Sequence, residues 1–293
     1  MRSKRPALFT RNDSIHKMTI KFTKMHGLGN DFIVIDAINQ TMNWTAGDIA
    51  KLSRRDTGIG FDQCLLLEAS MTPGIDFFYR IFNANGQEVG QCGNGARCLA
   101  RFARQYGLTQ KNTLTVATRT TQMTLHINPD ETVTVDMGKP KLNPKDIPIR
   151  ASNQAVYYTI PLKQGQTCEV QAISVGNPHV ILLVSDIKHA PVSALGIQIS
   201  QHAKFPEQTN VGFMEIETPE HVYLRVYERG CGETQACGSG AVAAMAIGRL
   251  YHQLSETVKV SLPGGDLIVQ WKSTEQPLFL TGPAAFVYEG MVI

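Results

Sequence analysis

Apolar and polar residues alternate in short runs along most of the chain, and this pattern predicts a protein rich in β-strands. A period of two places one face of a strand in a core and the other in solvent. The predicted strands are residues 18–24, 32–36, 64–67, 76–82, 155–161, 168–175, 179–184, 221–227 and 286–293, with a further β-rich stretch at 113–135. More strands are expected between the second cysteine motif and the Thr-Gly-Pro at 281–283. Short helices are expected at 45–53, capped by Thr45, and at 191–203. The order of these elements is not the regular alternation of a Rossmann sheet.

Two longer, Ala-rich segments also look helical, and each follows a copy of the same motif. Residues 88–96 and 233–241 both fit E-x-x-x-C-G-x-G-A, which puts Cys92 and Cys237 145 residues apart. This separation is far longer than the period of a solenoid repeat. The duplication therefore predicts two similar domains, each with one cysteine at a Gly-rich helix start.

That position gives a cysteine several chemical uses. A helix N-terminus favours the thiolate and lowers the pKa of a thiol, and glycines let backbone N–H groups approach an anion. One such site is compatible with a nucleophile, a redox thiol, a phosphate cradle or a plain packing residue. Two facing sites suggest something narrower. One thiolate removes a proton from a carbon while the other thiol delivers a proton to the opposite face, which inverts a stereocentre without a cofactor.

Length and charge argue against several classes of function and location. The chain has 293 residues and a net charge of +3, but residues 1–17 carry +4 and the remainder −1. A folded part without basic excess gives no reason to expect nucleic acid, and no apolar run is long enough to cross a membrane. Residues 1–17 lack the apolar run of a secretory signal. We expect a disordered extension before a start at Met18, with a short transit peptide as the alternative.

The six cysteines do not suggest a metal site. Cys92 and Cys98, like Cys231 and Cys237, have a C-x5-C spacing, whereas zinc knuckles use two to four intervening residues. A disulfide framework is not expected in a chain of this size without a signal. The other cysteines, Cys64, Cys168 and Cys231, are interpreted as packing residues.

Four stretches resemble diaminopimelate epimerases. They are G-L-G-N-D-F at 27–32, Q-C-G-N-G-A-R-C at 91–98, V-G-N-P-H at 175–179 and E-R-G-C-G-E-T-Q-A-C-G-S-G at 228–240. The resemblance runs from about residue 18 to residue 293. It implies an epimerase that needs neither pyridoxal phosphate nor another cofactor. Such an enzyme interconverts LL- and meso-diaminopimelate for lysine and peptidoglycan synthesis in a bacterial-type cytoplasm.

The resemblance also implies a fold of the α/β class, of α+β type. Two pseudo-symmetric domains each wrap a curved, mostly antiparallel sheet around a central helix, and the active site lies in the cleft between them. In this family the last strand returns to the first domain. Since residues 137–150 read as a Pro- and Gly-rich linker, the expected domains are 18–137 with 283–293, and 138–282.

Residue roles follow from the resemblance where the motifs match. Cys92 and Cys237 correspond to the acid/base pair, and His179 and Glu228 to residues that assist them. The expected substrate-binding set is Asn30, Gln63, Asn83, Gly93, Asn94, Asn177, Asn210, Glu228, Arg229, Gly238 and Ser239. Tyr288 corresponds to a tyrosine linked to dimerisation, although a packing role within its strand is an equal alternative. The expected partners are diaminopimelate and a second copy of the chain in a homodimer.

Other functions stay open at this point. Proline racemases and hydroxyproline epimerases share the paired-cysteine logic, but the Glu228-Arg229 and Asn-rich motifs count against them. A thiol redox or metal-binding protein would be a different class. The chain departs from the family pattern at Asn85, where Asp is usual, and at Cys231, where a small apolar residue is usual.

Overall fold

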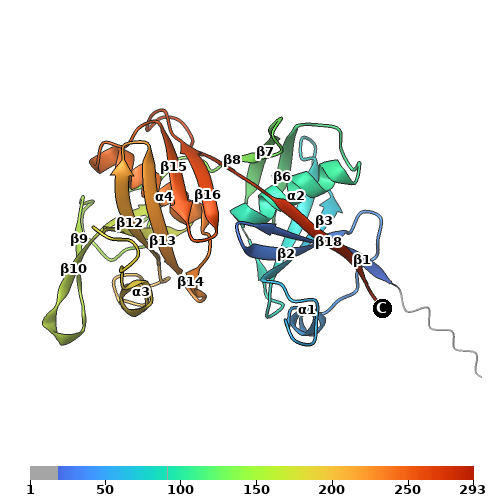
Figure 1. The fold of residues 1–293 in the computed structure, drawn as a ribbon, viewed down its shortest axis with the longest axis horizontal. Coiled ribbons are helices and arrows are strands. Elements are labelled where there is room, and N and C mark those ends of the chain that lie inside the picture. Colours follow the sequence, from blue (N-terminus) through green and yellow to red (C-terminus); the bar gives the residue numbers. More distant parts are fainter. Residues whose placement is uncertain (1–18, 91) are drawn as a thin grey trace, which may run out of the picture.

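The computed structural model describes residues 19–90 and 92–293. The extension expected at residues 1–17 lies outside the described residues. Two lobes lie side by side (Figure 1). We call them the first half, made of β1–β8, α1, α2 and β18, and the second half, made of β9–β17, α3 and α4.

The first half contains nine strands and two helices among the described residues. They are β1 (Ile20–Gly27), β2 (Asn30–Asp36), α1 (Ala46–Leu52), β3 (Gln63–Ala69), β4 (Phe77–Asn83), β5 (Glu88–Val89), α2 (Gly93–Gln105), β6 (Thr113–Ala117), β7 (Gln122–Ile127), β8 (Val133–Asp136) and, at the C-terminus, β18 (Ala285–Val292).

The second half has the same inventory plus one 3-10 turn. Its elements are β9 (Tyr158–Pro161), η1 (Lys163–Gly165), β10 (Thr167–Ser174), β11 (Pro178–Leu183), α3 (Val192–Ser200), β12 (Asn210–Thr218), β13 (His221–Glu228), β14 (Gly232–Thr234), α4 (Gly238–Tyr251), β15 (Thr257–Leu262), β16 (Gly265–Gln270) and β17 (Phe279–Gly282).

Strand pairing is the same in both halves. The first half pairs its strands in the order β18-β1-β2-β3-β4-β6-β7-β8, and β5 also pairs with β4. The second follows β9-β10-β11-β12-β13-β15-β16-β17, and β14 also pairs with β13. The two parallel pairs of each half are connected through a helix, and the other pairs are antiparallel. This topology confirms the predicted fold class of two pseudo-symmetric, mostly antiparallel sheets.

Two strand pairings tie the halves to each other and to the C-terminus. β8 pairs with β17, and the hydroxyls of Thr134 and Thr281 lie 2.7 Å apart across that pair. β18 leaves the second half and runs antiparallel to β1, with Tyr288 opposite Lys24 (Figure 1). These pairings support our proposed division into residues 18–137 with 283–293, and residues 138–282.

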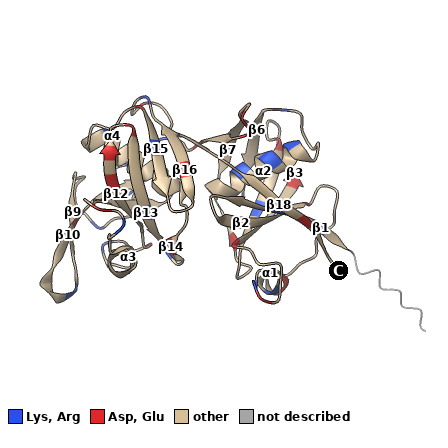
Figure 2. Ribbon diagram, in the orientation of Figure 1, with Lys and Arg blue, Asp and Glu red and all other residues tan. Residues whose placement is uncertain are grey.

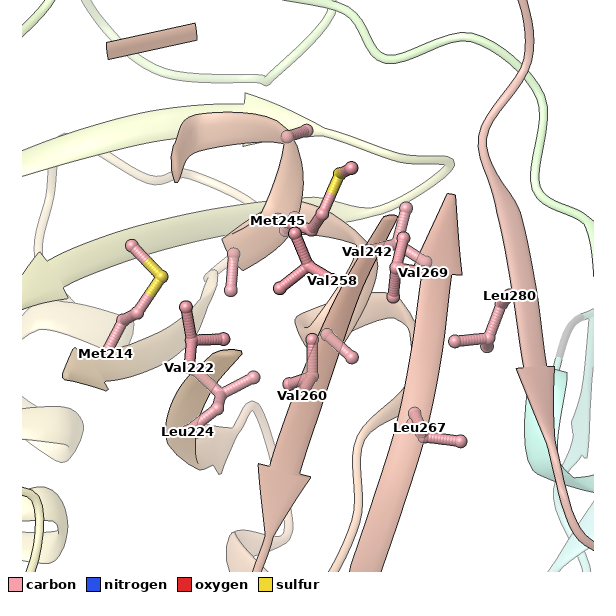
Figure 3. Close-up of a cluster of buried hydrophobic side chains, with 14 of the residues drawn as sticks. Met214, Val222, Leu224, Val242, Met245, Val258, Val260, Leu267, Val269 and Leu280 are labelled. Atoms are coloured by element: carbon pink, nitrogen blue, oxygen red, sulfur yellow. The ribbon is translucent and has the colours of Figure 1, made fainter. Parts of the chain in front are cut away.

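Each half wraps its sheet around the helix that follows its cysteine motif. α4 is buried on almost all sides from Gly240 to Gly248, as expected for a helix without a polar face. Its small residues let the strands approach closely, and Figure 3 shows Val242 and Met245 among side chains of the surrounding strands. α2 buries its Ala, Leu and Phe positions in the same way.

Local sequence signals were mostly reliable. Thr45 caps α1 as predicted: its Oγ1 accepts from the Asp48 N–H at 3.2 Å, while Asp48 accepts from the Thr45 N–H at 2.9 Å. The pattern assigned no element to residues 210–218, which form β12. This strand lies between β11 and β13 and begins with five consecutive buried residues. A strand buried on both faces does not alternate, so its period is invisible in the sequence.

The turn between β1 and β2 anchors the first half in the core of the second. Leu28 has a left-handed backbone (φ 55°), and its side chain packs in the cluster formed around α4. A Cβ at Gly264 would collide with the carbonyl of Leu28, so only glycine fits at that point of the second half. The relative placement of the halves therefore depends on apolar packing as well as on strand pairing.

We expect Leu28→Ala to lower the free energy of unfolding by about 2–3 kcal/mol, because it leaves a cavity at the seam between the halves. Denaturation by urea, followed by fluorescence and circular dichroism, measures the loss. Leu183→Ala is the matched control, since Leu183 is 45% exposed, and its change should stay within about 0.5 kcal/mol. Equal losses in the two variants would contradict an anchoring role for Leu28.

Candidate active site

Cys92 and Cys237 occupy the same place in the two halves, at the N-cap of a buried helix. Cys92 caps α2, and its Sγ accepts from the Gly95 N–H at 3.3 Å. Cys237 caps α4, with its Sγ 3.6 Å from the Ser239 Oγ. Both caps have extended backbones, so each thiol projects beside the free N–H groups of the first helical turn.

The two helix starts meet across the seam between the halves. The side-chain amide of Asn94, the second residue of α2, donates to the Ala236 carbonyl at 3.2 Å. On the other side, a Cβ at Gly238 would lie 3.4 Å from the Asn94 Oδ1. The chain thus brings together two cysteine motifs that are 145 residues apart in the sequence.

Strand register places the predicted polar residues at the same sheet ends in both halves. Gln63 lies opposite Asn83 in the first half. In the second, Asn210 lies opposite His179, and the register of β12 with β13 brings it beside Glu228. The equivalent positions, first half then second, are Asn30 and Asn177, Phe32 and His179, Gln63 and Asn210, Asn83 and Glu228, and Asn94 and Ser239.

The first-half residues form a short amide network. The Gln63 Nε2 donates to the Asn83 Oδ1 at 2.9 Å. The Asn30 Oδ1 accepts from the Asn94 Nδ2 at 3.3 Å and lies 4.0 Å from the Cys92 Sγ. Asn30, the first residue of β2, therefore connects the start of that strand to the first cysteine.

A charged cluster behind Asn30 was not anticipated from the sequence. Asp31 pairs with Lys24 at 2.5 Å and with Arg55 at 2.7 Å, and Arg55 also reaches Asp62 at 2.9 Å. Although burial raises the pKa of Asp31, hydrogen bonds from the two cations lower it to about 2. The Asp62 carboxylate in turn accepts from the Asn30 amide at 2.9 Å, so the cluster orients a predicted site residue. The only sequence feature that pointed to this charged cluster was the Asn-Asp pair in the motif at 27–32.

In the second half, His179 is the centre of the polar cluster. Its fully buried Nε2 lies 3.0 Å from the Ser239 Oγ, 3.1 Å from the Asn177 Oδ1 and 3.2 Å from the Asn210 Nδ2. Burial, together with the charge of Arg229, lowers the pKa of His179 to about 3. The imidazole is therefore neutral and acts as a hydrogen-bonding hub.

Glu228 and Arg229 lie at the end of β13, on the side of Cys237. Burial raises the pKa of Glu228, which accepts from the Thr234 hydroxyl at 2.5 Å. The backbone N–H of Arg229 donates to the Asn210 Oδ1 at 2.9 Å, while its guanidinium, within the described part of the chain, reaches only the Glu207 carbonyl at 3.0 Å. Arg229 as a residue is partly exposed, and this one hydrogen bond of its guanidinium leaves other donors for a ligand.

The thiol pKa values correct one expectation. The helix starts were predicted to lower them, but burial raises the pKa of Cys92 to about 11 despite the Gly95 N–H. Burial and the neighbouring Glu228 also raise the pKa of Cys237 well above its ordinary value. Removing a thiolate from water costs more free energy than hydrogen bonds from a few N–H groups restore. Both thiols therefore hold their protons more tightly than a free thiol does.

The remaining cysteines and possible metal ligands do not converge on a second centre. Cys98 is buried in the core of the first half, and Cys231 is exposed. Within residues 19–90 and 92–293, no three His, Cys, Asp or Glu side chains gather as a metal site would require. No helix in the same part of the chain is long and apolar enough to cross a membrane.

Solved structures with this architecture define the structural class. A hydroxyproline epimerase from Agrobacterium vitis, solved with bound trans-4-hydroxy-L-proline, is 14% identical with a TM-score of 0.66 and covers 94% of this chain and 93% of its own. A phenazine biosynthesis protein of the PhzF family from Bacillus anthracis is 16% identical with a TM-score of 0.66 and covers 94% and 99%. The protein thus has the two-lobed fold that these proteins share.

Sequence comparison identifies the family within that class. The diaminopimelate epimerase model matches residues 22–143 and 171–287. Diaminopimelate epimerases of Legionella pneumophila strains Corby and Lens are 64% identical over 276 residues, which cover 94% of this chain and 100% of theirs. The chain belongs to the diaminopimelate epimerase family and is therefore an isomerase.

We expect Cys92 and Cys237 to form a disulfide when the protein is oxidised, because their helix starts meet at the seam. A disulfide needs Cα atoms about 4.4–6.8 Å apart, so a small movement of the halves is enough. Oxidation should be slow at pH 7 and faster as pH rises toward 11, since the fraction of reactive thiolate grows with pH. Peptide mapping by mass spectrometry identifies the bond, and dithiothreitol should reverse it. Oxidised protein in which both thiols stay free, or pair with other cysteines, would exclude this geometry.

Proposed function

We propose that the protein interconverts LL- and meso-diaminopimelate by a two-base mechanism that uses Cys92 and Cys237 and no cofactor. The observation that carries this proposal is the meeting of two N-cap cysteines at one seam, in a chain of the diaminopimelate epimerase family. The reaction would supply lysine and peptidoglycan precursors in the cytoplasm. Neither nucleic acid nor a membrane is a proposed partner.

Inversion at one carbon needs a base on one face and an acid on the other. In one direction the Cys92 thiolate removes the α-proton and the Cys237 thiol delivers a proton to the opposite face. In the other direction the roles exchange. The backbone N–H groups of the first helical turns, at Gly93, Asn94, Gly238 and Ser239, stabilise the reacting carboxylate, whose negative charge grows as the α-proton leaves.

The polar residues around the thiols suit a substrate with amino and carboxylate groups at both ends. Amide side chains offer donors and acceptors together, which matches a zwitterion. We assign this binding role to Asn30, Gln63, Asn83, Asn177 and Asn210. The guanidinium of Arg229 can hold a carboxylate with two parallel hydrogen bonds. Glu228 and His179, next to Cys237 and Ser239, assist the proton transfer on that side.

We expect purified protein to convert LL-diaminopimelate and to leave L-proline unchanged, as measured by chiral chromatography. Cys92→Ala and Cys237→Ala should each lower kcat by about 100-fold to 10,000-fold, because an acid or base is lost. Cys98→Ala is the control, since Cys98 is buried in the same helix but faces the core. Faster turnover of L-proline would favour the proline racemase alternative. Equal damage from Cys98→Ala would show that Cys92 is not the base.

We also propose that the protein is a homodimer assembled through β18. Among the described strands β18 pairs only with β1, so its other edge is free for a second chain. Val287, Tyr288 and Met291 on this strand, and Ile293 directly after it, are large, apolar and exposed. Tyr288 also packs edge-on against Phe22, with ring centroids 6.1 Å apart, which is the packing role left open above.

Light scattering should give wild-type protein twice the chain mass of 32.3 kDa. Tyr288→Ala should shift the protein toward monomer, because it removes apolar area from the proposed interface. Tyr157→Ala, a similarly exposed tyrosine of the second half, should leave the mass unchanged. A wild-type protein that is monomeric at micromolar concentration would refute the dimer.

A further inference from the structure

Arg97 is a buried charge that the mechanism above does not use. It lies on α2, five residues after Cys92, and is 0% exposed. No carboxylate of residues 19–90 and 92–293 pairs with its guanidinium, and its Nη1 has no hydrogen-bond partner there. An arginine keeps its charge when buried, and such charges are usually paired because desolvation is costly. A fully buried cation without a carboxylate partner therefore calls for a functional explanation.

Two glycines make room for this guanidinium at the seam, and a third lies at ordinary contact distance. A Cβ at Gly27 would lie 3.2 Å from Nη2, and one at Gly282 would lie 3.3 Å from Nε. A Cβ at Gly238, the first residue of α4, would lie 3.9 Å from the unpartnered Nη1. The guanidinium thus reaches from the first half to the start of the second cysteine helix. Its Nε donates to the Pro283 carbonyl at 3.2 Å, where the chain crosses between the halves.

The guanidinium also sets the orientation of Asn94. Its Nη2 donates to the Asn94 Oδ1 at 3.0 Å. Because a guanidinium has donors only, the oxygen of Asn94 must face it and the amide nitrogen must face away. That nitrogen makes the contact across the seam to the Ala236 carbonyl and the contact to Asn30. Arg97 on one side and the Ala236 carbonyl on the other therefore fix the orientation of the Asn94 amide between them.

The second half has no equivalent cation. Five residues after Cys237 stands Val242, which packs in the apolar core in Figure 3. Figure 2 shows the basic residues of α2 as blue bands, and Arg97 is the fully buried one. Cys237 instead has the carboxylate of Glu228 close by, at the position where the first half has Asn83. Glu228 acts on both thiols, but among the residues that the structure describes only Cys92 also has a cation nearby.

Several groups act on the pKa of Cys92. Burial raises it most and Glu228 of β13 raises it as well, while the Gly95 N–H and, more weakly, Arg97 lower it. Tyr79 of β4 and Cys98 of α2 also face this thiol and hold their protons more tightly because of it. Arg97 is thus the cation that favours charge on Cys92, whereas Glu228 disfavours charge on both thiols.

We propose that Arg97 is a positioning residue that fixes Asn94 across the seam and directs the first negative charge of the thiol pair to Cys92 rather than Cys237. This inference rests on the proposed function, because only a two-base epimerase needs one thiolate and one thiol at the same time. The residues that make the halves unequal, Arg97 and Glu228, then determine which thiol is the base in the empty site.

The test measures thiol ionisation without substrate, so its outcome is separate from that of the turnover assay. Full-length protein is alkylated with iodoacetamide across a pH series, and mass spectrometry gives the rate at Cys92 and at Cys237. Because the two thiols differ in exposure, we compare how the two alkylation rates depend on pH, and not the absolute rates. In wild type, alkylation of Cys92 should rise at lower pH than alkylation of Cys237.

Arg97→Met should lower the Cys92 rate at a fixed pH near 8 by about tenfold, equivalent to one pKa unit. The Cys237 rate should change much less. Arg97→Lys keeps the charge and should recover most of the Cys92 rate. The matched control is Arg101→Met, which removes a charge one turn further along α2 and a contact to the crossover at the Ala284 carbonyl. It should leave both rates near those of wild type.

Two outcomes would overturn the proposal. The first is a Cys92 rate in folded Arg97→Met that equals the rate in Arg101→Met. The second is alkylation of Cys237 at lower pH than Cys92 in wild-type protein. This outcome can be measured even if Arg97→Met fails to fold. A protein that shows the predicted alkylation but does not turn over diaminopimelate would refute the proposed function and leave the assignment of Arg97 intact.

Discussion

The contact between two helix N-termini at the seam is the constraint on which the rest of the structure depends. Two thiols can serve one carbon only if they approach it from opposite sides, so neither half can bind and react alone. The contact from Asn94 to the Ala236 carbonyl is polar and small. It is held in place by larger elements that surround it, namely the β8–β17 pair, the anchored Leu28 and the returning strand β18.

The two halves share a topology but not their electrostatics. Every strand and helix of one half has a counterpart in the other, and so do the cysteines. At equivalent positions, however, the first half has Phe32 and Asn83, while the second has His179 and Glu228. Arg97 likewise corresponds to Val242. A duplicated scaffold would give two identical bases, whereas inversion requires an acid and a base at the same moment. The differences at these positions are where the symmetry of the chain is broken.

Much of the fold could be predicted because its signals are local. Period-two runs marked most strands, Thr45 marked the start of α1, and the repeated C-G-x-G-A element marked α2 and α4. β12 was missed because a strand buried on both faces loses its alternation. Arg97 was missed for a related reason. It stands in an ordinary helical position, and only its 0% exposure distinguishes it from Arg101 on the same helix.

By itself the sequence determined the two cysteine motifs, their place at helix starts, the strand-rich fold and the resemblance to diaminopimelate epimerases. These features depend on residues close together in the chain or on direct comparison of motifs. The tertiary structure decided which distant groups meet and how much water reaches them. It brought Asn94 to Ala236 and Arg97 to the seam, and it raised the thiol pKa values that the helix starts alone would have lowered. The physical reason is that desolvation and charge proximity are properties of three-dimensional neighbours, and spacing along the chain does not encode them.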